Sequence, residues 1–406
     1  MTDFPPDFLW GSGTAAHQVE GGNTNNDWWD WEHNPDSPAV VPSGDANDHW
    51  NRYEQDFALL AALGQNAHRF SLEWSRIEPA PGEFSRAALD HYARVLDCLA
   101  ANSLTAFTTL FHFTVPRWFA QRGGWLAPDA VELFGRYVDR VSAALGDRMP
   151  YVCTVNEPQI VALMAHGLGS FPPGHRDMAE AATVNGLLMQ AHRTATSALR
   201  AGRGKPQVGT SLQLPVVEPL DPTNQGDAAR AAGLKGLLVD SHLADLTAGG
   251  DVGDFVGLQY YTRLRIDSTA PSPIAPPPAG AETTQMNWEI YPSGFGESLR
   301  TAASTGLPVI VTENGIATTD DAQRIRFLES HLTELKSVID SGVDVRGYLH
   351  WTSFDNFEWS HGYHPTFGLI GIDRDNGLRR VVRPSAVAYG ELARTGSLKA
   401  LRGGAS

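Results

Sequence analysis

The stretch Tyr151-Val152-Cys153-Thr154-Val155-Asn156-Glu157-Pro158 runs from a short apolar, β-branched segment into a glutamate. A second segment of this kind, Pro308–Glu313, ends in Thr312-Glu313-Asn314-Gly315. Short β-branched runs predict strands that are buried in a parallel sheet. Two carboxylates at the ends of two such strands are what combined acid/base and nucleophilic catalysis requires. Glu157 and Glu313 are therefore the first candidates for a catalytic site.

The same alternation of a short strand and a longer helical segment recurs along the chain. The predicted strands are Phe8–Gly13, Ala67–Trp74, Thr105–Phe113, Tyr151–Asn156, Gln207–Leu214, Phe255–Thr262, Pro308–Glu313 and Arg346–Phe354. Between them, apolar residues recur at helical spacing. Four such stripes are Trp50, Tyr53, Phe57 and Leu60; Leu89, Tyr92, Leu96 and Leu99; Phe134, Val138, Val141 and Leu145; and Ile325, Leu328, Leu332, Leu335 and Ile339. Gly146 follows the third stripe and predicts the end of that helix.

Repeated β-α units without a break in composition predict an α/β fold, a single (β/α)₈ TIM barrel, with residues 1–406 as one domain. A doubly wound open sheet would also alternate strands and helices. Such a sheet usually binds its ligand at a glycine-rich first turn, and no G-x-G-x-x-G motif follows the first predicted strand. The barrel is therefore preferred, with the active site at the carboxyl ends of the strands.

Composition and charge narrow the class of partner. A hydrophobic fraction of 42% and a charged fraction of 19% are ordinary for a globular protein with a sizeable core. The formal net charge of −15 argues against nucleic acid or an anionic membrane surface as a partner. No apolar run approaches ~18 residues, so no transmembrane helix is expected. The start of the chain lacks a signal-peptide pattern, so a cytoplasmic location is expected.

Three smaller features complete the outline of the chain. Cys98 and Cys153 lie in a helical and a strand pattern, so both are expected to be small core residues. Pro271–Pro278 predicts an exposed loop after the sixth strand, and a proline-rich partner motif is the less favoured interpretation. Arg402–Ser406 are expected to fray. The sequence leaves the oligomeric state open, a homo-oligomer included.

Polar residues gather at the carboxyl ends of the predicted strands. In a barrel these ends converge on one mouth, where partly buried polar groups need partners. The residues concerned are His17, Gln18 and Glu20; Arg69 and Glu73; His112; Asn156 and Glu157; Gln259, Tyr260 and Tyr261; Glu313 and Asn314; and Trp351, Asp355, Asn356, Glu358 and Trp359.

The composition of this set suits a sugar. Gln, His, Asn and Glu side chains bind hydroxyl groups, and Trp351 and Trp359 offer flat apolar faces to the C–H side of a sugar ring. No cluster of Arg and Lys is present to receive a phosphate. None of the four lysines, Lys205, Lys235, Lys336 and Lys399, lies at the carboxyl end of a predicted strand, which argues against Schiff-base chemistry.

The charged candidates also have structural interpretations. Glu313 alone could be a helix N-terminal carboxylate, and Glu157 alone an ion-paired acid. Together, three strands apart on a barrel, they favour catalysis. Arg69 is expected to pair with a glutamate rather than with a substrate, because a charge inside a barrel needs a partner.

The aromatic and histidine candidates have structural interpretations too. Asp27–Trp31 holds three tryptophans and is interpreted as a packed loop in preference to a sugar platform. His112 and His350 lack metal-ligand spacing. His112 is expected to bind a hydroxyl group, and His350 to face the helices.

With these motifs, the sequence resembles the family 1 glycoside hydrolases, the β-glucosidase family, over nearly its whole length. The matching motifs are Phe8-Leu9-Trp10-Gly11 with Gln18-Val19-Glu20-Gly21; Arg69 to Arg76; Thr154 to Pro158; Thr312 to Gly315; and Trp351 with Asp355 to Trp359 and Gly362-Tyr363.

The resemblance implies a retaining β-glycosidase that acts on a small-molecule β-glycoside or oligosaccharide, without a metal or cofactor. Glu313 would be the nucleophile and Glu157 the general acid/base, with Arg69 and Tyr261 holding Glu313 in place. The implied substrate-binding residues are Gln18, His112, Asn156, Trp351, Glu358, Trp359 and Phe367.

Three positions depart from the family pattern. Phe113 stands where many members have Trp, which removes a hydrogen-bond donor. Gln259 replaces the usual Asn before the paired tyrosines, and Thr366 stands where a basic residue is common. The segments around strands five and six are shorter than typical, so a more open leaving-group side is expected.

In a retaining mechanism the two carboxyl groups lie about 5–5.5 Å apart. Burial beside the Glu313 charge would raise the pKa of Glu157, and Arg69 would keep Glu313 ionised. The rival hypotheses are a non-catalytic sugar-binding barrel, a β-galactosidase, β-fucosidase or transglycosidase of the same family, and a metal-dependent barrel enzyme. The last lacks a carboxylate at the end of strand five, Gln213-Leu214-Pro215.

Overall fold

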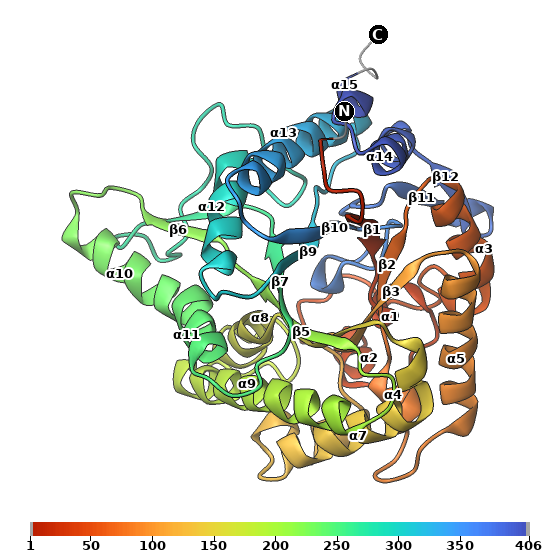
Figure 1. The fold of residues 1–406 in the computed structure, drawn as a ribbon. Helices are drawn as coiled ribbons and strands as arrows, with labels where there is room; N and C mark the ends of the chain where they lie inside the picture. Colours follow the sequence, from red (N-terminus) through yellow and green to blue (C-terminus); the bar gives the residue numbers. More distant parts are fainter. Residues whose placement is uncertain (1–2, 403–406) are drawn as a thin grey trace.

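Eight parallel strands close into a barrel in the computed structural model of this chain, which describes residues 3–402 (Figure 1). Around the barrel the order is β1 (Leu9–Gly13), β10 (Val345–Trp351), β9 (Val309–Asn314), β7 (Phe255–Tyr260), β5 (Gln207–Gln213), β4 (Tyr151–Asn156), β3 (Thr105–Phe111) and β2 (Ala67–Ser71). The ring closes at β1, where Gly13 lies opposite Trp351 on one side and Arg69 on the other. The predicted (β/α)₈ barrel is therefore confirmed.

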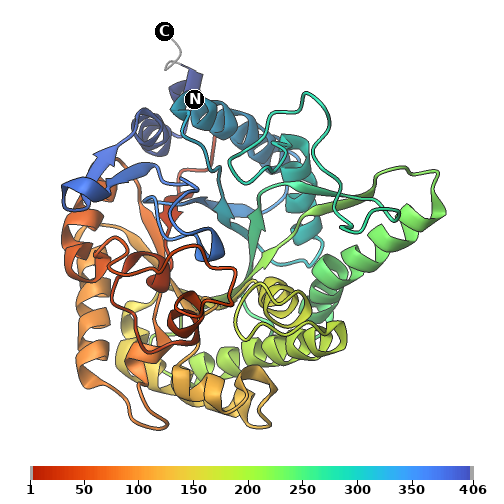
Figure 2. The same ribbon diagram turned by 180° about the vertical axis from the view of Figure 1, so that it is seen from behind.

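Helices surround the strands (Figure 2). The longer ones are α3 (His49–Ala62), α5 (Arg86–Ala101), α7 (Ala130–Leu145), α9 (Met178–Ala201), α10 (Gln225–Lys235), α12 (Pro292–Ala303), α13 (Asp321–Asp340) and α14 (Pro384–Thr395). The shorter ones are α1 (Ala16–Val19), α2 (Asp27–Glu32), α4 (Trp74–Ile77), α6 (Arg117–Gln121), α8 (Pro158–Val161), α11 (Ser241–Thr247) and α15 (Lys399–Arg402). Single turns are η1 (Gly124–Leu126), η2 (Gly146–Arg148), η3 (Ala162–Gly167), η4 (Gly236–Asp240), η5 (Trp359–His361) and η6 (Arg374–Asn376).

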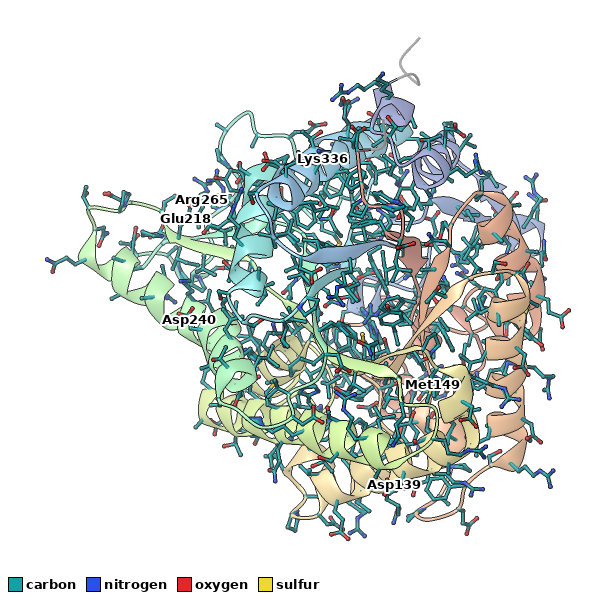
Figure 3. All side chains as sticks on the ribbon, viewed as in Figure 1. Asp139, Met149, Glu218, Asp240, Arg265 and Lys336 are labelled. Carbon is teal, nitrogen blue, oxygen red and sulfur yellow. The ribbon has the colours of Figure 1, made fainter. Side chains whose placement is uncertain are left out.

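The predicted helical stripes face inward. Phe57, Leu96, Val138 and Leu332, one from each stripe, are at most 2% exposed. Lys336 lies on α13 in the helical layer, away from the barrel interior (Figure 3). Lys235 and Lys399 also lie on helices, and Lys205 precedes β5. The four lysines therefore stay clear of the carboxyl ends of the strands, as the sequence predicts.

Gly146 follows the last residue of α7, so the predicted helix end is confirmed, but for a different reason. Its φ of −51° is right-handed, and the chain continues into η2. A Cβ atom at this position would lie 2.4 Å from the carbonyl oxygen of Arg203. Close approach of two backbones, rather than a left-handed cap, requires glycine here.

Two features of the sheet were not predicted. β6 (Val216–Pro219) and β8 (Arg263–Ile266) form a parallel pair that continues β5 and β7 beyond the barrel. With α10, η4 and the loop as far as Ile274 this pair forms a projection, here called the arm, which extends to one side in both views (Figures 1 and 2). β11 (Ile370–Asp373) and β12 (Arg379–Val382) form a small antiparallel pair.

Five strands end earlier than predicted, with β5 ending at Gln213 and β7 at Tyr260. β2 stops at Ser71 because Glu73 caps α4, accepting a 3.3 Å hydrogen bond from the Ser75 N–H. β3 stops at Phe111, and Phe113 has a left-handed φ of 74°. β10 stops at Trp351 rather than at Phe354. At β2, β3 and β10 the chain turns at the barrel mouth instead of extending past it.

The lower part of the barrel is filled by apolar side chains. Ala67, Phe107, Cys153, Phe255, Ile310 and Leu349 form this plug. Cys153 is therefore the small core residue that the sequence predicts, whereas Cys98, on α5, is only partly buried. The polar residues of the strands lie above the plug, toward the mouth.

Two further predictions concern the segments outside the barrel. Pro271–Pro278 form an exposed to half-buried loop after β8, as predicted. The fraying predicted for 402–406 falls outside the described residues except at Arg402, which ends α15. Within residues 3–402 no helix combines the length and apolarity needed to cross a membrane.

Candidate active site

Glu313 lies at the end of β9 and is gripped by two side chains. Arg69, fully buried on β2, donates through Nη1 to Glu313 Oε1 at 2.5 Å. The hydroxyl of Tyr261, just after β7, donates to Glu313 Oε2 at 2.5 Å. Burial raises the pKa of Glu313 above its usual range, while the charge of Arg69 and the Tyr261 hydrogen bond oppose this rise. Both carboxylate oxygens are thus held in one orientation and favoured in the ionised form by named partners.

Glu157 has the opposite surroundings. It follows β4 in a left-handed conformation, with φ 47°, and its backbone N–H donates to Ser211 O at 2.8 Å. Its side chain is buried, and Oε1 has no hydrogen-bond partner among the described residues. Burial, then the charge of Glu313, raise the pKa of Glu157 well above its usual range, although Arg69 lowers it. A carboxyl group in these surroundings is shifted toward its protonated form.

A polar network lies between the two glutamates. Asn156 Oδ1 accepts hydrogen bonds from Arg69 Nη2 and, at 2.8 Å, from Gln259 Nε2. Asn156 Nδ2 lies 3.3 Å from His112 Nε2. Burial, with the charge of Arg69, lowers the pKa of His112 well below its usual range, so the ring is neutral. Because its oxygen already accepts two hydrogen bonds, Asn156 is oriented with its amide nitrogen toward His112.

Gln259, which replaces the usual Asn before the paired tyrosines, still takes part in the polar network. The longer side chain still faces the barrel interior, where it holds Asn156, and its own Oε1 has no partner among the described residues. The neighbouring Tyr260 points outward instead and donates to Tyr291 O at 2.7 Å. Sequence reasoning noted Gln259 as a departure but did not identify it as part of the site.

A second polar pair lies across the mouth. Gln18, on α1, donates through Nε2 to Phe357 O at 2.9 Å and to Glu358 Oε2 at 3.3 Å, leaving its own Oε1 without a partner among the described residues. Burial, then the charge of Glu313, raise the pKa of Glu358 to about 8, against the Gln18 hydrogen bond. Glu358 can therefore both donate and accept hydrogen bonds near neutral pH.

Stacked aromatic rings support this pair. Trp359 packs on Trp28 and Phe113, with ring centroids 4.6 and 5.1 Å apart. Trp28 is only 1% exposed and is packed as predicted, whereas Trp29 and Trp31 are half-buried, and the segment is a helix, α2, rather than the predicted loop. The signal for that helix was Asn26, whose side chain accepts the Trp29 N–H at 2.8 Å as a cap.

One cavity of about 510 Å³ joins these parts. Its inner wall carries both glutamates with His112, Phe113, Tyr261, Trp351, Glu358, Trp359 and Phe367. Three further residues do not line the cavity themselves but bond to side chains that do: Gln18 to Glu358, Asn156 to His112, and Arg69 to Glu313. Every predicted site residue is therefore brought to the same place.

The outer wall of the cavity was missed by sequence reasoning. It is mostly apolar and includes Met164, Leu168, Phe171, Leu234, Leu238, Leu264, Ile274, Met286 and Trp288. Leu234, Leu238, Leu264 and Ile274 come from the arm. Trp288 packs on Tyr261, with ring centroids 5.4 Å apart.

The remaining candidates lie outside this cavity. Thr366, at the position where a basic residue is common, bonds to Gln285 Oε1 at 2.9 Å and not to the cavity. His350 faces the helices, as predicted, 6.1 Å from the ring of Tyr389 on α14. Among the described residues, neither His350 nor His112 belongs to a cluster that could hold a metal ion.

Known proteins share this sequence and architecture. The model of glycosyl hydrolase family 1 matches residues 1–251 and 238–397. A "Beta-glucosidase A" of Acetivibrio thermocellus is 31% identical, with 96% of this chain and 98% of the relative covered. The structure of a "beta-glycosidase from Pyrococcus horikoshii" is 34% identical, with a TM-score of 0.91 and 98% and 96% coverage. A "Beta-glucosidase from Thermotoga maritima in complex with glucoimidazole" is 28% identical, with a TM-score of 0.91 and 97% and 99% coverage.

The barrel, the two buried glutamates at its mouth and these matches define a glycoside hydrolase. The matches cover almost the full length of this chain and of each of these relatives. The chain belongs to glycosyl hydrolase family 1.

Proposed function

We propose that this enzyme is a retaining β-glycosidase, β-glucosidase-like, which releases terminal non-reducing β-D-glycosyl residues through a covalent glycosyl-enzyme. The observation that carries the proposal is the contrast between two carboxyl groups in one cavity. Glu313 is held by Arg69 and Tyr261, whereas Glu157 is buried and its Oε1 has no partner among the described residues. Environments that separate two pKa values in this way assign the nucleophile and the acid.

In the first step Glu313 attacks the anomeric carbon, and Glu157 gives its proton to the leaving oxygen. The C–O bond to the leaving group breaks as the bond to Glu313 forms. In the second step Glu157, now ionised, takes a proton from water, which attacks the same carbon and releases Glu313. No step requires a group other than the two carboxyls and water.

The sugar is held by the polar rim of the cavity. In this proposal Glu358 and Gln18, which contact each other, bind one set of hydroxyl groups, and the pair His112 and Asn156 binds another. Trp351, whose ring is stacked 5.9 Å from that of His112, offers a face to the sugar ring. A glucosyl unit is the preferred ligand because similar proteins are named beta-glucosidase and one was solved with glucoimidazole.

The leaving group is proposed to be apolar. Outside the glutamate pair the wall consists of side chains such as Leu168, Leu234, Leu238 and Ile274, and it lacks the density of polar groups seen around the sugar position. An aromatic or alkyl aglycone buries apolar surface there, whereas a second sugar leaves its hydroxyl groups with fewer partners. Aryl and alkyl β-glucosides are therefore expected to be better substrates than cellobiose.

The decisive experiment follows the anomer released from a β-glycoside by NMR with fresh enzyme. The β anomer should appear first, because the proposed double displacement inverts the anomeric carbon twice and so retains its configuration. If the α anomer appears first, the double-displacement mechanism is wrong. A panel of nitrophenyl β-glycosides in the same assay ranks glucose against galactose and fucose and tests whether the enzyme is instead a β-galactosidase or β-fucosidase.

Three rival functions are tested separately. No turnover of any nitrophenyl glycoside would favour a non-catalytic sugar-binding barrel. Transfer to added alcohols that outpaces hydrolysis would favour a transglycosidase. Loss of turnover in the presence of a chelator would favour a metal-dependent enzyme.

Two sequence predictions stay predictions. One domain, residues 1–406, is proposed to carry the whole activity. A cytoplasmic location is supported by Cys98 and Cys153, which are both free thiols, as is usual in a reducing compartment.

A further inference from the structure

Two histidines and a glutamate converge at a point outside the sugar cavity. His166, His175 and Glu180 each offer one ligand atom, and these atoms lie within 4.8 Å of one another. The Nδ1 atoms of both imidazoles lie 2.5 Å from the same oxygen, Glu180 Oε1. Within residues 3–402 no other three His, Cys, Asp or Glu side chains are gathered as closely.

Main-chain hydrogen bonds hold the three residues in place. His166 lies in η3, a single π-helical turn of the kind that often marks functional sites. The backbone N–H of His175 donates to Ala165 O at 2.9 Å, and that of Asp177 donates to His166 O at 2.8 Å. Asp177 also caps α9, where it accepts the backbone N–H of Glu180. The convergence is therefore set by the backbone and does not depend on flexible side chains alone.

The ligand set is that of a transition-metal site. Two imidazole nitrogens and one carboxylate oxygen match the His₂Glu set that binds Zn²⁺ with one position left open. Imidazole-rich sites suit zinc and its neighbours, whereas Mg²⁺ and Ca²⁺ prefer oxygen ligands alone. Without a metal, Glu180 Oε1 can accept a hydrogen bond from each Nδ1 at 2.5 Å, and a bound cation would replace these two contacts with bonds to one centre. A shared cation satisfies all three groups at once.

The site also has a way in and room for a further ligand. The side chain of His175 is 47% exposed, and that of Glu180 is 23% exposed. His166 and His175 line a second cavity of about 450 Å³, separate from the one that holds the glutamate pair. We propose that His166, His175 and Glu180 bind one Zn²⁺, or a similar divalent transition-metal ion, which takes no part in glycoside cleavage.

The segment between the two histidines gives the ion a structural role. It carries Phe171, whose ring lies 4.9 Å from Trp28, 5.7 Å from Phe113 and 6.4 Å from Trp359 by centroid distance. A metal that joins His166 and His175 to α9 closes this segment into a loop with Phe171 fixed in the wall of the sugar cavity. Metal binding should therefore stabilise the fold and leave the chemistry of the glutamates unchanged.

The test uses untagged, chelator-treated full-length enzyme and Zn²⁺ alone. Calorimetric titration should show one saturable site. With Zn²⁺ at about 100 times its dissociation constant, the Tm should rise by about 3 °C. His175→Ala should weaken binding by about 10-fold or more and remove the Tm rise. His33→Ala, which removes an exposed histidine outside the cluster, should bind as the wild type does. Co²⁺ should give visible absorption bands with the wild type and with His33→Ala only.

Several outcomes would overturn the site. They are no saturable Zn²⁺ binding by the wild type, equal binding by His175→Ala, or equal loss in His33→Ala. Glu180→Gln keeps the side-chain volume and removes the carboxylate ligand. This variant therefore tests the metal site if His175→Ala fails to fold. Retained binding in a folded Glu180→Gln variant would likewise refute the proposal. Because the readouts are binding and Tm, they are independent of whether the proposed β-glycosidase activity is found.

Discussion

The hydroxyl of Tyr261 donates a hydrogen bond to Glu313, and its removal in Tyr261→Phe is expected to move the acid limb of the pH profile. The donor lies 2.5 Å from Glu313 Oε2 in a buried setting. It favours the ionised form of Glu313, so its loss raises the pKa of that carboxyl. The nucleophile must be ionised, and activity falls as the pH drops through its pKa. The limb should therefore shift toward higher pH.

The size of the shift follows from the kind of bond. A hydrogen bond to a charged group contributes about 1.5–3 kcal/mol. Since ~1.4 kcal/mol corresponds to one pKa unit, the limb should move up by about 1–2 units. Arg69 still holds the other oxygen of Glu313, so the variant keeps an oriented nucleophile and remains active at higher pH.

The assay is kcat/KM for a nitrophenyl β-glucoside over the acidic range. Tyr260→Phe is the matched control, because the neighbouring tyrosine loses a hydrogen bond of its own, to Tyr291 O, on the helix side of the barrel. That variant should lose some stability and keep the wild-type limb. A limb that stays in place in folded Tyr261→Phe, or that moves equally in Tyr260→Phe, would refute the assigned role of Tyr261.

Other substitutions test the two glutamates and one backbone contact. Glu313→Ala should lose several orders of magnitude in turnover while remaining folded, and azide should partly restore it with an α-glycosyl azide as product; near-normal turnover would refute the nucleophile assignment. Glu157→Gln should remove the alkaline limb of the kcat/KM profile, because the group that must stay protonated is gone. The variant should also slow the cleavage of alkyl glycosides far more than that of dinitrophenyl glycosides. An unchanged alkaline limb would show that another residue is the acid. Gly146→Ala should lower the free energy of unfolding by about 1–3 kcal/mol, measured by denaturant titration, because its Cβ would meet the Arg203 carbonyl at 2.4 Å; full stability would show that the two backbones can separate without cost.

The eight barrel strands could be predicted because most of them are short apolar or β-branched runs next to segments with helical periodicity. Those signals are local, and burial on both faces keeps them strong. β8 could not be found in the same way. Its sequence Arg263-Leu264-Arg265-Ile266 is half-buried outside the barrel, and it pairs only because β5 and β7 continue past the mouth. The turn at Phe113 was missed because a left-handed φ at a residue other than glycine is fixed by tertiary contacts.

The inner half of the site was predictable for a related reason. Residues such as Gln18, His112 and Glu358 stand at strand ends or within motifs, so topology alone brings them together. The outer wall of the cavity could not be predicted, because Leu238, Trp288 and similar residues look in the sequence like ordinary apolar residues of helices and loops. The three-dimensional path of the arm places Leu238 against the cavity, and the loop before α12 places Trp288 there.

Because the arm is structurally separate from the barrel, the residues of the arm can change in evolution without altering the barrel. Glu157 and Glu313 lie at the ends of barrel strands, whereas Leu234, Leu238, Leu264 and Ile274 belong to a projection that shares no strand ladder with the barrel. Under the proposed function, exchange of these side chains, or a graft of the whole projection from a relative, should change which leaving group is preferred and leave the barrel intact.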